Sequence, residues 1–167
     1  MLDTKDTERL KFSPSYNADF TIKPVSFSAI AEGAKTFFNH SFFGAVNLEF
    51  NVNESRVASI SSEGFALFYK TILKKLFGKG LLNISFDTNG GELIIISYYD
   101  DLPEFDSATR RELELIAELS GFSAEFSSLG NTRYVTAIIS ECPDVFLQLY
   151  AITDFEIHSA MTKIFFT

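Results

Sequence analysis

The sequence contains no tryptophan, one cysteine and two histidines. Cys142 has no partner for an intramolecular disulfide, and His40 and His158 are too few for a structural zinc site. The longest apolar run, Leu93–Ile96, is much shorter than a membrane span, so we expect no membrane insertion. The N-terminus is charged from its third residue and lacks the apolar stretch of a signal peptide. These absences predict a cytoplasmic protein.

Basic residues are also scarce. The sequence has 14 Lys and Arg against 22 Asp and Glu, which gives a net charge of -8. A nucleic-acid binder needs a basic stripe, and docking on anionic lipid needs a basic patch, so we expect neither kind of partner. What the sequence does contain is 19 phenylalanines and 46% apolar residues among 167. That composition excludes a disordered chain and suffices for one core, so residues 1–167 are predicted to form a single domain.

The spacing of apolar residues predicts the order of the elements. Periods of three to four residues predict helices and strict alternation predicts strands. We expect helices at 27–40, between Ser61 and Gly78, and at 107–120, and strands at 46–51, 82–86, 93–99, 122–127 and 134–140. The tail, 144–167, is amphipathic and is predicted as a helix, with a terminal strand as the alternative. Helices interspersed with hairpins predict an α/β (α+β) two-layer sandwich, with one mixed, largely antiparallel sheet and helices on one face.

Residues 22–140 carry a resemblance to a known family. The segments "VNLEFNVNESRVASISSEGFALFYKTILKKLFGKGLLNISF" and "RELELIAELSGFSAEFSSLGNTRYVTAII" resemble, in order and spacing, the ATPase domain of histidine kinases and of related gyrase-like ATPases. The resemblance implies that 22–140 form an ATPase-like core, and residues 143–167 a C-terminal extension. It also implies a cleft for ATP and Mg²⁺.

The same resemblance assigns four residues to that cleft. Lys70 and Lys74 stand at the polar positions of the helix that carries the family's metal-binding Asn. Asp100 stands at the position of the adenine-binding Asp, and Thr132 at a threonine that can contact phosphate. A protonated lysine has no lone pair for Mg²⁺, so we expect no metal site. Because Leu102 replaces a glycine and the glycine-rich lid is missing, the site is expected to be degenerate, with no catalytic residue and with ATP left open as a ligand.

Three functions remain after these observations. We favour a non-catalytic regulatory or protein-interaction module of bacterial signalling, a pseudo-ATPase whose partner is a signalling protein or a second copy of the chain. The alternative within the same family is an ATP-binding protein kinase of the histidine-kinase or anti-sigma-factor type. The third is an unrelated enzyme or ligand-binding protein on a similar fold, since a fold does not fix a function. The sequence shows no Ser/His/Asp, Cys/His or paired-carboxylate pattern in support of that third hypothesis.

Overall fold

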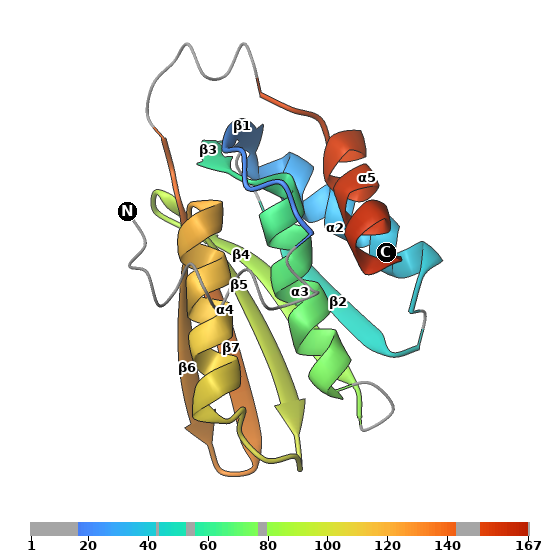
Figure 1. Ribbon diagram of the computed structural model, residues 1–167, viewed down its shortest axis with the longest axis vertical. Coiled ribbons are helices and arrows are strands. Elements are labelled where there is room, and N and C mark those ends of the chain that lie inside the picture. The colour runs from blue at the N-terminus through green and yellow to red at the C-terminus, as the bar shows by residue number, and fades with distance from the viewer. Residues whose placement is uncertain (1–16, 43, 53–55, 77–79, 143–150, 167) are drawn as a thin grey trace.

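The computed structural model describes residues 17–42, 44–52, 56–76, 80–142 and 151–166. The elements, in chain order, are β1 (Lys23–Ser26), α2 (Phe27–His40), β2 (Val46–Asn51), β3 (Val57–Ile60), α3 (Ser62–Leu76), β4 (Leu82–Asn89), β5 (Glu92–Asp100), α4 (Ser107–Ser120), β6 (Ser123–Leu129), β7 (Thr132–Ser140) and α5 (Asp154–Phe165). Figure 1 shows their arrangement. Every helix and strand predicted between residues 27 and 140 is present, with ends that differ by a few residues. The predicted end of the second helix at Gly78 lies outside the described residues.

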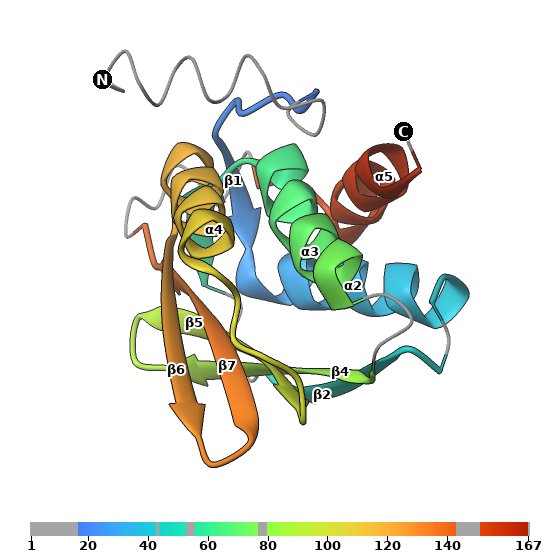
Figure 2. The ribbon, with the colours of Figure 1, turned by 60° about the horizontal axis from the view of Figure 1, so that its bottom comes forward.

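The main sheet has the strand order β2-β4-β5-β7-β6. β2 runs parallel to β4, with Val46 opposite Leu82, and the other three pairs are antiparallel. Figure 2 shows the helices on one side of this sheet. The two-layer α+β sandwich with a mixed, largely antiparallel sheet is therefore confirmed.

A second, two-stranded sheet departs from the prediction of a single sheet. It consists of β1 and β3, which pair antiparallel with Lys23 opposite Ile60. Val57, Ala58 and Ile60 are all buried, so β3 lacks the alternation of apolar and polar residues that identifies a strand with one wet face. Sequence periodicity therefore missed it.

The core lies between the main sheet and the helices. The inward side chains of β5 and β7 alternate with half-buried ones, and five phenylalanines from the helices and β4 are at most 1% exposed. These are Phe27, Phe37, Phe65, Phe68 and Phe86. The abundant phenylalanine thus serves partly to fill this core, in which a buried aromatic side chain contributes about 1.5–3 kcal/mol.

Helix ends follow from local hydrogen bonds. The side chain of Ser26 accepts a hydrogen bond from the backbone N–H of Ala29 at 3.0 Å, which starts α2 directly after β1. Gly121 has φ 92° and ends α4 in the left-handed conformation that glycine adopts without strain.

The predicted C-terminal helix is confirmed as α5, while residues 144–150 lie outside the described part of the chain. Ile152 forms an isolated parallel bridge with Val25, and its N–H donates to the carbonyl oxygen of Pro24 at 2.9 Å. α5 packs against both α2 and α3. None of the helices in the described ranges is long and apolar enough to cross a membrane.

Candidate functional site

One cleft lies where the resemblance expects a nucleotide, between the end of α3, the connection 101–106 and the start of α4. Its volume is about 200 Å³. Ligand pockets usually have volumes of about 300–1,000 Å³, so this cleft is smaller than the usual range. Its lining consists of Lys75, Leu76, Leu102, Pro103, Glu104, Phe105, Asp106 and Thr109.

The connection 101–106 is tied to the β6–β7 hairpin. The Nε of Arg133 donates to the carbonyl oxygen of Leu102 at 3.3 Å, and the Oγ of Ser128 donates to the Oε1 of Glu104 at 2.6 Å. This hydrogen bond from Ser128, together with the nearby charge of Arg133, holds the pKa of Glu104 below its usual value. The connection is therefore held by side chains of the hairpin, whereas a nucleotide lid must be free to open and close.

Aromatic and apolar side chains pack beside the same cleft. Tyr99 is buried, and its ring centroid lies 5.5 Å from that of Phe105, which is only 9% exposed. The hydroxyl of Tyr99 donates to the carbonyl oxygen of Pro103 at 3.4 Å, and burial raises the pKa of Tyr99. Leu102 approaches from the other side, with its Cδ1 3.5 Å from where a Cβ on Gly80 would stand. The space beside the end of β5 is thus occupied by the chain itself.

A carboxylate of the chain itself lies at the start of α4. Helix N-termini attract phosphates because their first N–H groups have no partner within the helix. Here the Oδ1 of Asp106 accepts from the N–H of Thr109 at 2.7 Å. This bond holds the pKa of Asp106 below its usual value, and the charges of Lys75 and Arg110 act in the same direction. A carboxylate therefore occupies the place that a phosphate would need.

Lys70 and Lys74 do not line this cleft. The Nζ of Lys70 donates to the carbonyl oxygen of Ile164 at 2.8 Å, so it places a positive charge at the C-terminal end of α5, where the helix dipole favours one. Desolvation, and then the charge of Lys74, lowers the pKa of Lys70. Lys74 is exposed. The lysine of α3 that does line the cleft is Lys75, which the sequence analysis did not select.

Asp100 and Thr132 come together, but away from the cleft. They stand opposite each other at the ends of β5 and β7, and the Oγ1 of Thr132 donates to the Oδ1 of Asp100 at 2.5 Å. Side chains of β5 alternate between the two faces of the sheet, and Tyr99 points inward, toward the helices. Asp100 therefore lies on the opposite face, together with Ile94, Ile96 and Tyr98. The structure therefore divides the four assigned residues between two places and brings none of them to the cleft.

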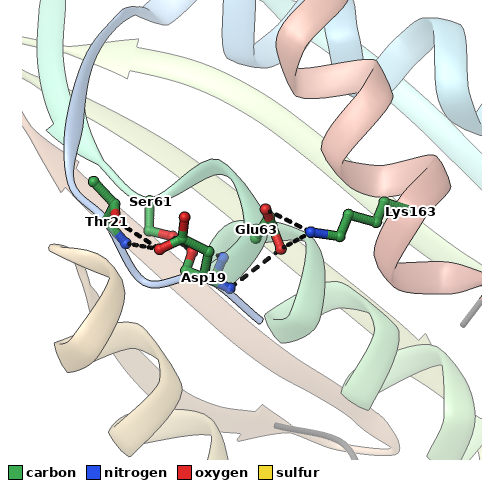
Figure 3. A network of polar contacts seen from close by, with 6 residues as sticks. Asp19, Thr21, Ser61, Glu63 and Lys163 are labelled. Carbon is green, nitrogen blue, oxygen red and sulfur yellow. Dashed lines mark hydrogen bonds and ion pairs between the residues drawn. The ribbon is translucent and has the colours of Figure 1, made fainter. Parts of the chain in front are cut away.

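A second cleft, also of about 200 Å³, lies where the segment before β1 meets α3 and α5. In Figure 3, the carboxylate of Glu63 lies between Lys163 and Asp19. The Nζ of Lys163 donates to both carboxylate oxygens of Glu63, at 3.0 and 3.1 Å, and the N–H of Asp19 donates to Oε1 at 3.2 Å. The Oγ of Ser61 donates to the carbonyl oxygen of Asp19 at 2.9 Å. These groups satisfy one another, so the network joins three segments of the chain.

No group of three or more His, Cys, Asp and Glu side chains in the described ranges could hold a metal ion. The oxygen-bearing side chains of the first cleft fit Mg²⁺ poorly, because the carboxylate of Glu104 is bonded to Ser128 and that of Asp106 caps α4. The residues present therefore do not fit the Mg²⁺ that the resemblance implied.

Comparisons with known proteins agree with this fold. No protein-family profile matches the sequence, and no curated protein matches it. Among solved structures, the histidine kinase AdeS of Acinetobacter baumannii matches with a TM-score of 0.54 and 12% identity, over 82% of this chain and 76% of that one. The histidine kinase domain of the E. coli osmosensor EnvZ matches with a TM-score of 0.54 and 8% identity, over 77% and 94%. The nucleotide-free catalytic domain of the histidine kinase ThkA gives a TM-score of 0.52 and 11% identity, over 75% and 99%.

The chain thus has the fold of a histidine-kinase ATPase domain, as its resemblance predicted. At these identities the likeness concerns the fold alone.

Proposed function

We propose that this chain is a regulatory or protein-interaction module of bacterial signalling in the cytoplasm, built on the histidine-kinase ATPase fold and inactive as an ATPase. The observation that carries the proposal is the small size of the cleft at the end of α3. Its volume of about 200 Å³ is bounded by Leu102 and Phe105, and its connection is tied to the β6–β7 hairpin.

The charges in the cleft support the same proposal. Phosphoryl transfer depends on metal ions and cationic donors that stabilise the transferred group. Among the described residues that line the cleft, Lys75 is the cationic one and Glu104 and Asp106 are the acidic ones, and Arg133 forms an ion pair with Glu104 at 3.6 Å. A phosphate placed at the start of α4 would therefore meet the carboxylate of Asp106, which already caps that helix.

Thermal unfolding with ATP or ADP, with and without Mg²⁺, tests the proposal. A ligand at 100 times its Kd stabilises a protein by about 2.7 kcal/mol. For a chain of this length that corresponds to an increase in Tm of roughly 5–11 °C. We expect no saturable increase with either nucleotide at millimolar concentration.

A matched variant makes the result decisive. Leu102→Gly restores the small residue that the resemblance expects, and Leu102→Trp fills the cleft further. If nucleotide raises the Tm of the unchanged chain and Leu102→Trp abolishes that increase, the nucleotide binds in this cleft. The alternative, an ATP-binding histidine or anti-sigma-factor kinase, would then replace the proposal.

A further inference from the structure

β2 is an edge strand of the main sheet (Figure 1), and in the described part of the chain no other strand pairs with its outer side. The carbonyl oxygen of Ala45 accepts a hydrogen bond from the N–H of Leu82 on β4 at 3.1 Å. Because β2 and β4 pair in parallel, this bond determines which residues of β2 direct their backbone groups toward β4. Alternate residues of a parallel strand bond the same neighbour, so the backbone groups of Asn47 and Glu49 face β4. Those of Val46, Leu48 and Phe50 consequently face the free edge.

This edge has little of the usual protection. Edge strands are commonly guarded by charged side chains, lysine above all, by proline or by a bulge that prevents pairing with another chain. Val46–Asn51 contains no lysine and no proline, Glu49 is its one charged residue, and its six residues pair with β4 in an unbroken register. The other edge strand, β6, differs because its groove with α4 is lined by Arg110, Arg111 and Glu114.

An apolar groove accompanies the free edge on the helix side. It lies between α2 and β2, has a volume of about 460 Å³, and is lined by Phe38, Leu48, Phe50 and Leu81 among others. Leu81 is 47% exposed, which is unusual for a large apolar side chain beside a core. Among the described residues of the lining, Lys35 is the charged one, and its Nζ lies 5.5 Å from the ring centroid of Phe50. A strand added at this edge would place its inward side chains in that groove.

We propose that β2 pairs antiparallel with β2 of a second copy, about a twofold axis at Leu48. In this register Leu48 stands opposite Leu48, Val46 opposite Phe50, and Asn47 opposite Glu49 of the other copy. The three residues whose N–H and C=O groups face the free edge then form hydrogen-bonded pairs in both copies. The inward side chains of one copy enter the groove of the other, where they meet Phe38 and Leu81.

Charge selects this register over its neighbours. Centring the pair on Glu49 places the two Glu49 carboxylates directly opposite each other and leaves Val46 of each copy without a partner in β2. Centring it on Asn47 also pairs the backbone groups of only two of the three edge-facing residues in each copy. Like charges directly opposite are destabilising, and the chain already carries a net charge of -8. The interface is small, so we expect a weak dimer that forms as concentration rises.

Two substitutions at one exposed position test the register. Asn47→Glu places glutamate opposite Glu49 twice in each dimer, and Asn47→Lys places lysine there. Both remove the same hydrogen bond from Asn47 to Asn83, so they are matched controls. In sedimentation equilibrium from micromolar to millimolar protein, we expect the dimer Kd to rise with glutamate and fall with lysine, each by roughly two- to thirty-fold, because each of the two pairs contributes about 0.2–1 kcal/mol.

Disulfide trapping tests the same geometry. In a Cys142→Ser background, Asn47→Cys and Glu49→Cys are prepared separately and then mixed under mild oxidation. Residues 47 and 49 of opposite copies form a non-hydrogen-bonded pair with Cα atoms about 4.5 Å apart, whereas 47 and 47 are diagonal at about 7–8 Å. A disulfide needs Cα atoms within about 7 Å, so the mixed dimer should form faster than either homodimer.

A chain that stays monomeric at every concentration would overturn the proposal. So would equal effects of the two Asn47 variants, or homodimers that cross-link as fast as the mixed pair. The proposal is independent of the proposed function, because nucleotide binding in the α3 cleft would refute the latter and leave the β2 edge unaffected.

Discussion

Gly33 is the residue at which α5 crosses α2, and it provides the sharpest test of how the C-terminal extension packs. A Cβ added at Gly33 would lie 2.5 Å from the Cβ of Ile157, 2.7 Å from its Cγ2 and 2.7 Å from the carbonyl oxygen of Asp154. Non-bonded carbon atoms are most stable at about 3.5–4.0 Å, so the shortfall is about 1 Å. One of the contacts is backbone, which means that α5 itself must move.

The expected effect combines two opposing contributions. Overpacking of a core contact costs about 1–3 kcal/mol, while alanine in place of glycine within a helix gains about 0.5–1 kcal/mol. Three heavy atoms within 2.7 Å, one of them in the backbone, place the overpacking cost in the upper part of its range, about 2–3 kcal/mol. We therefore expect Gly33→Ala to lower the free energy of unfolding by about 1–2.5 kcal/mol, and for a chain of this length the Tm should fall by roughly 2–10 °C.

The assay is urea denaturation and thermal unfolding followed by circular dichroism, with Glu32→Ala on the exposed face of α2 as the control. A double variant that adds Ile157→Ala removes the Cγ2 contact. It should be less destabilised than the sum of the two single variants, because the pair is in direct contact. A neutral or stabilising Gly33→Ala would refute the packing of α5 on α2.

Three further predictions concern polar groups. The lowered pKa of Asp106 means that its stabilising effect is present above its ordinary pKa of 3.8 and is lost as pH falls through the folded-state value. The Tm deficit of Asp106→Ala should therefore shrink on acidification, whereas Asp106→Asn, which still caps α4, should cost less at neutral pH. Lys163→Met breaks the ion pair with Glu63 and should cost less than about 1 kcal/mol in urea denaturation, with a smaller effect at high salt. Lys70→Met keeps the alkyl stem but loses the bond to Ile164; it should cost about 1 kcal/mol and increase hydrogen exchange at the end of α5.

Most of the fold could be predicted from the sequence because its signals are local. The alternation in β2, the glycine turn between β4 and β5, and the caps of α2 and α4 each depend on residues near one another in the chain. β3 could not be predicted in this way, because three of its four residues are buried and they show no period. The contact of α5 with α2 depends on Gly33 and Ile157, which are far apart in the sequence.

The candidate site was harder to predict, for two different reasons. Helical spacing showed that Lys70 and Lys74 share a face of α3, but it could not show that α5 lies against Lys70 or that Lys75 faces the cleft. The position of Asp100, in contrast, could have been found. Leu93, Ile95, Ser97 and Tyr99 are the inward residues of β5, so the alternation already placed Asp100 on the opposite face.

Two other helices hold α3 in place. α4 packs on one side of α3 and α5 on another, and the lysine at the expected metal-binding position bonds the end of α5. Leu102 and Phe105 line the small cleft at the end of α3. In the described chain, α3 therefore contributes its side chains to holding the fold together, whereas the edge proposed to pair with a second copy belongs to a different element, β2. This separation predicts that substitutions at the β2 edge change association without changing the response to nucleotide, and that substitutions around Leu102 do the reverse.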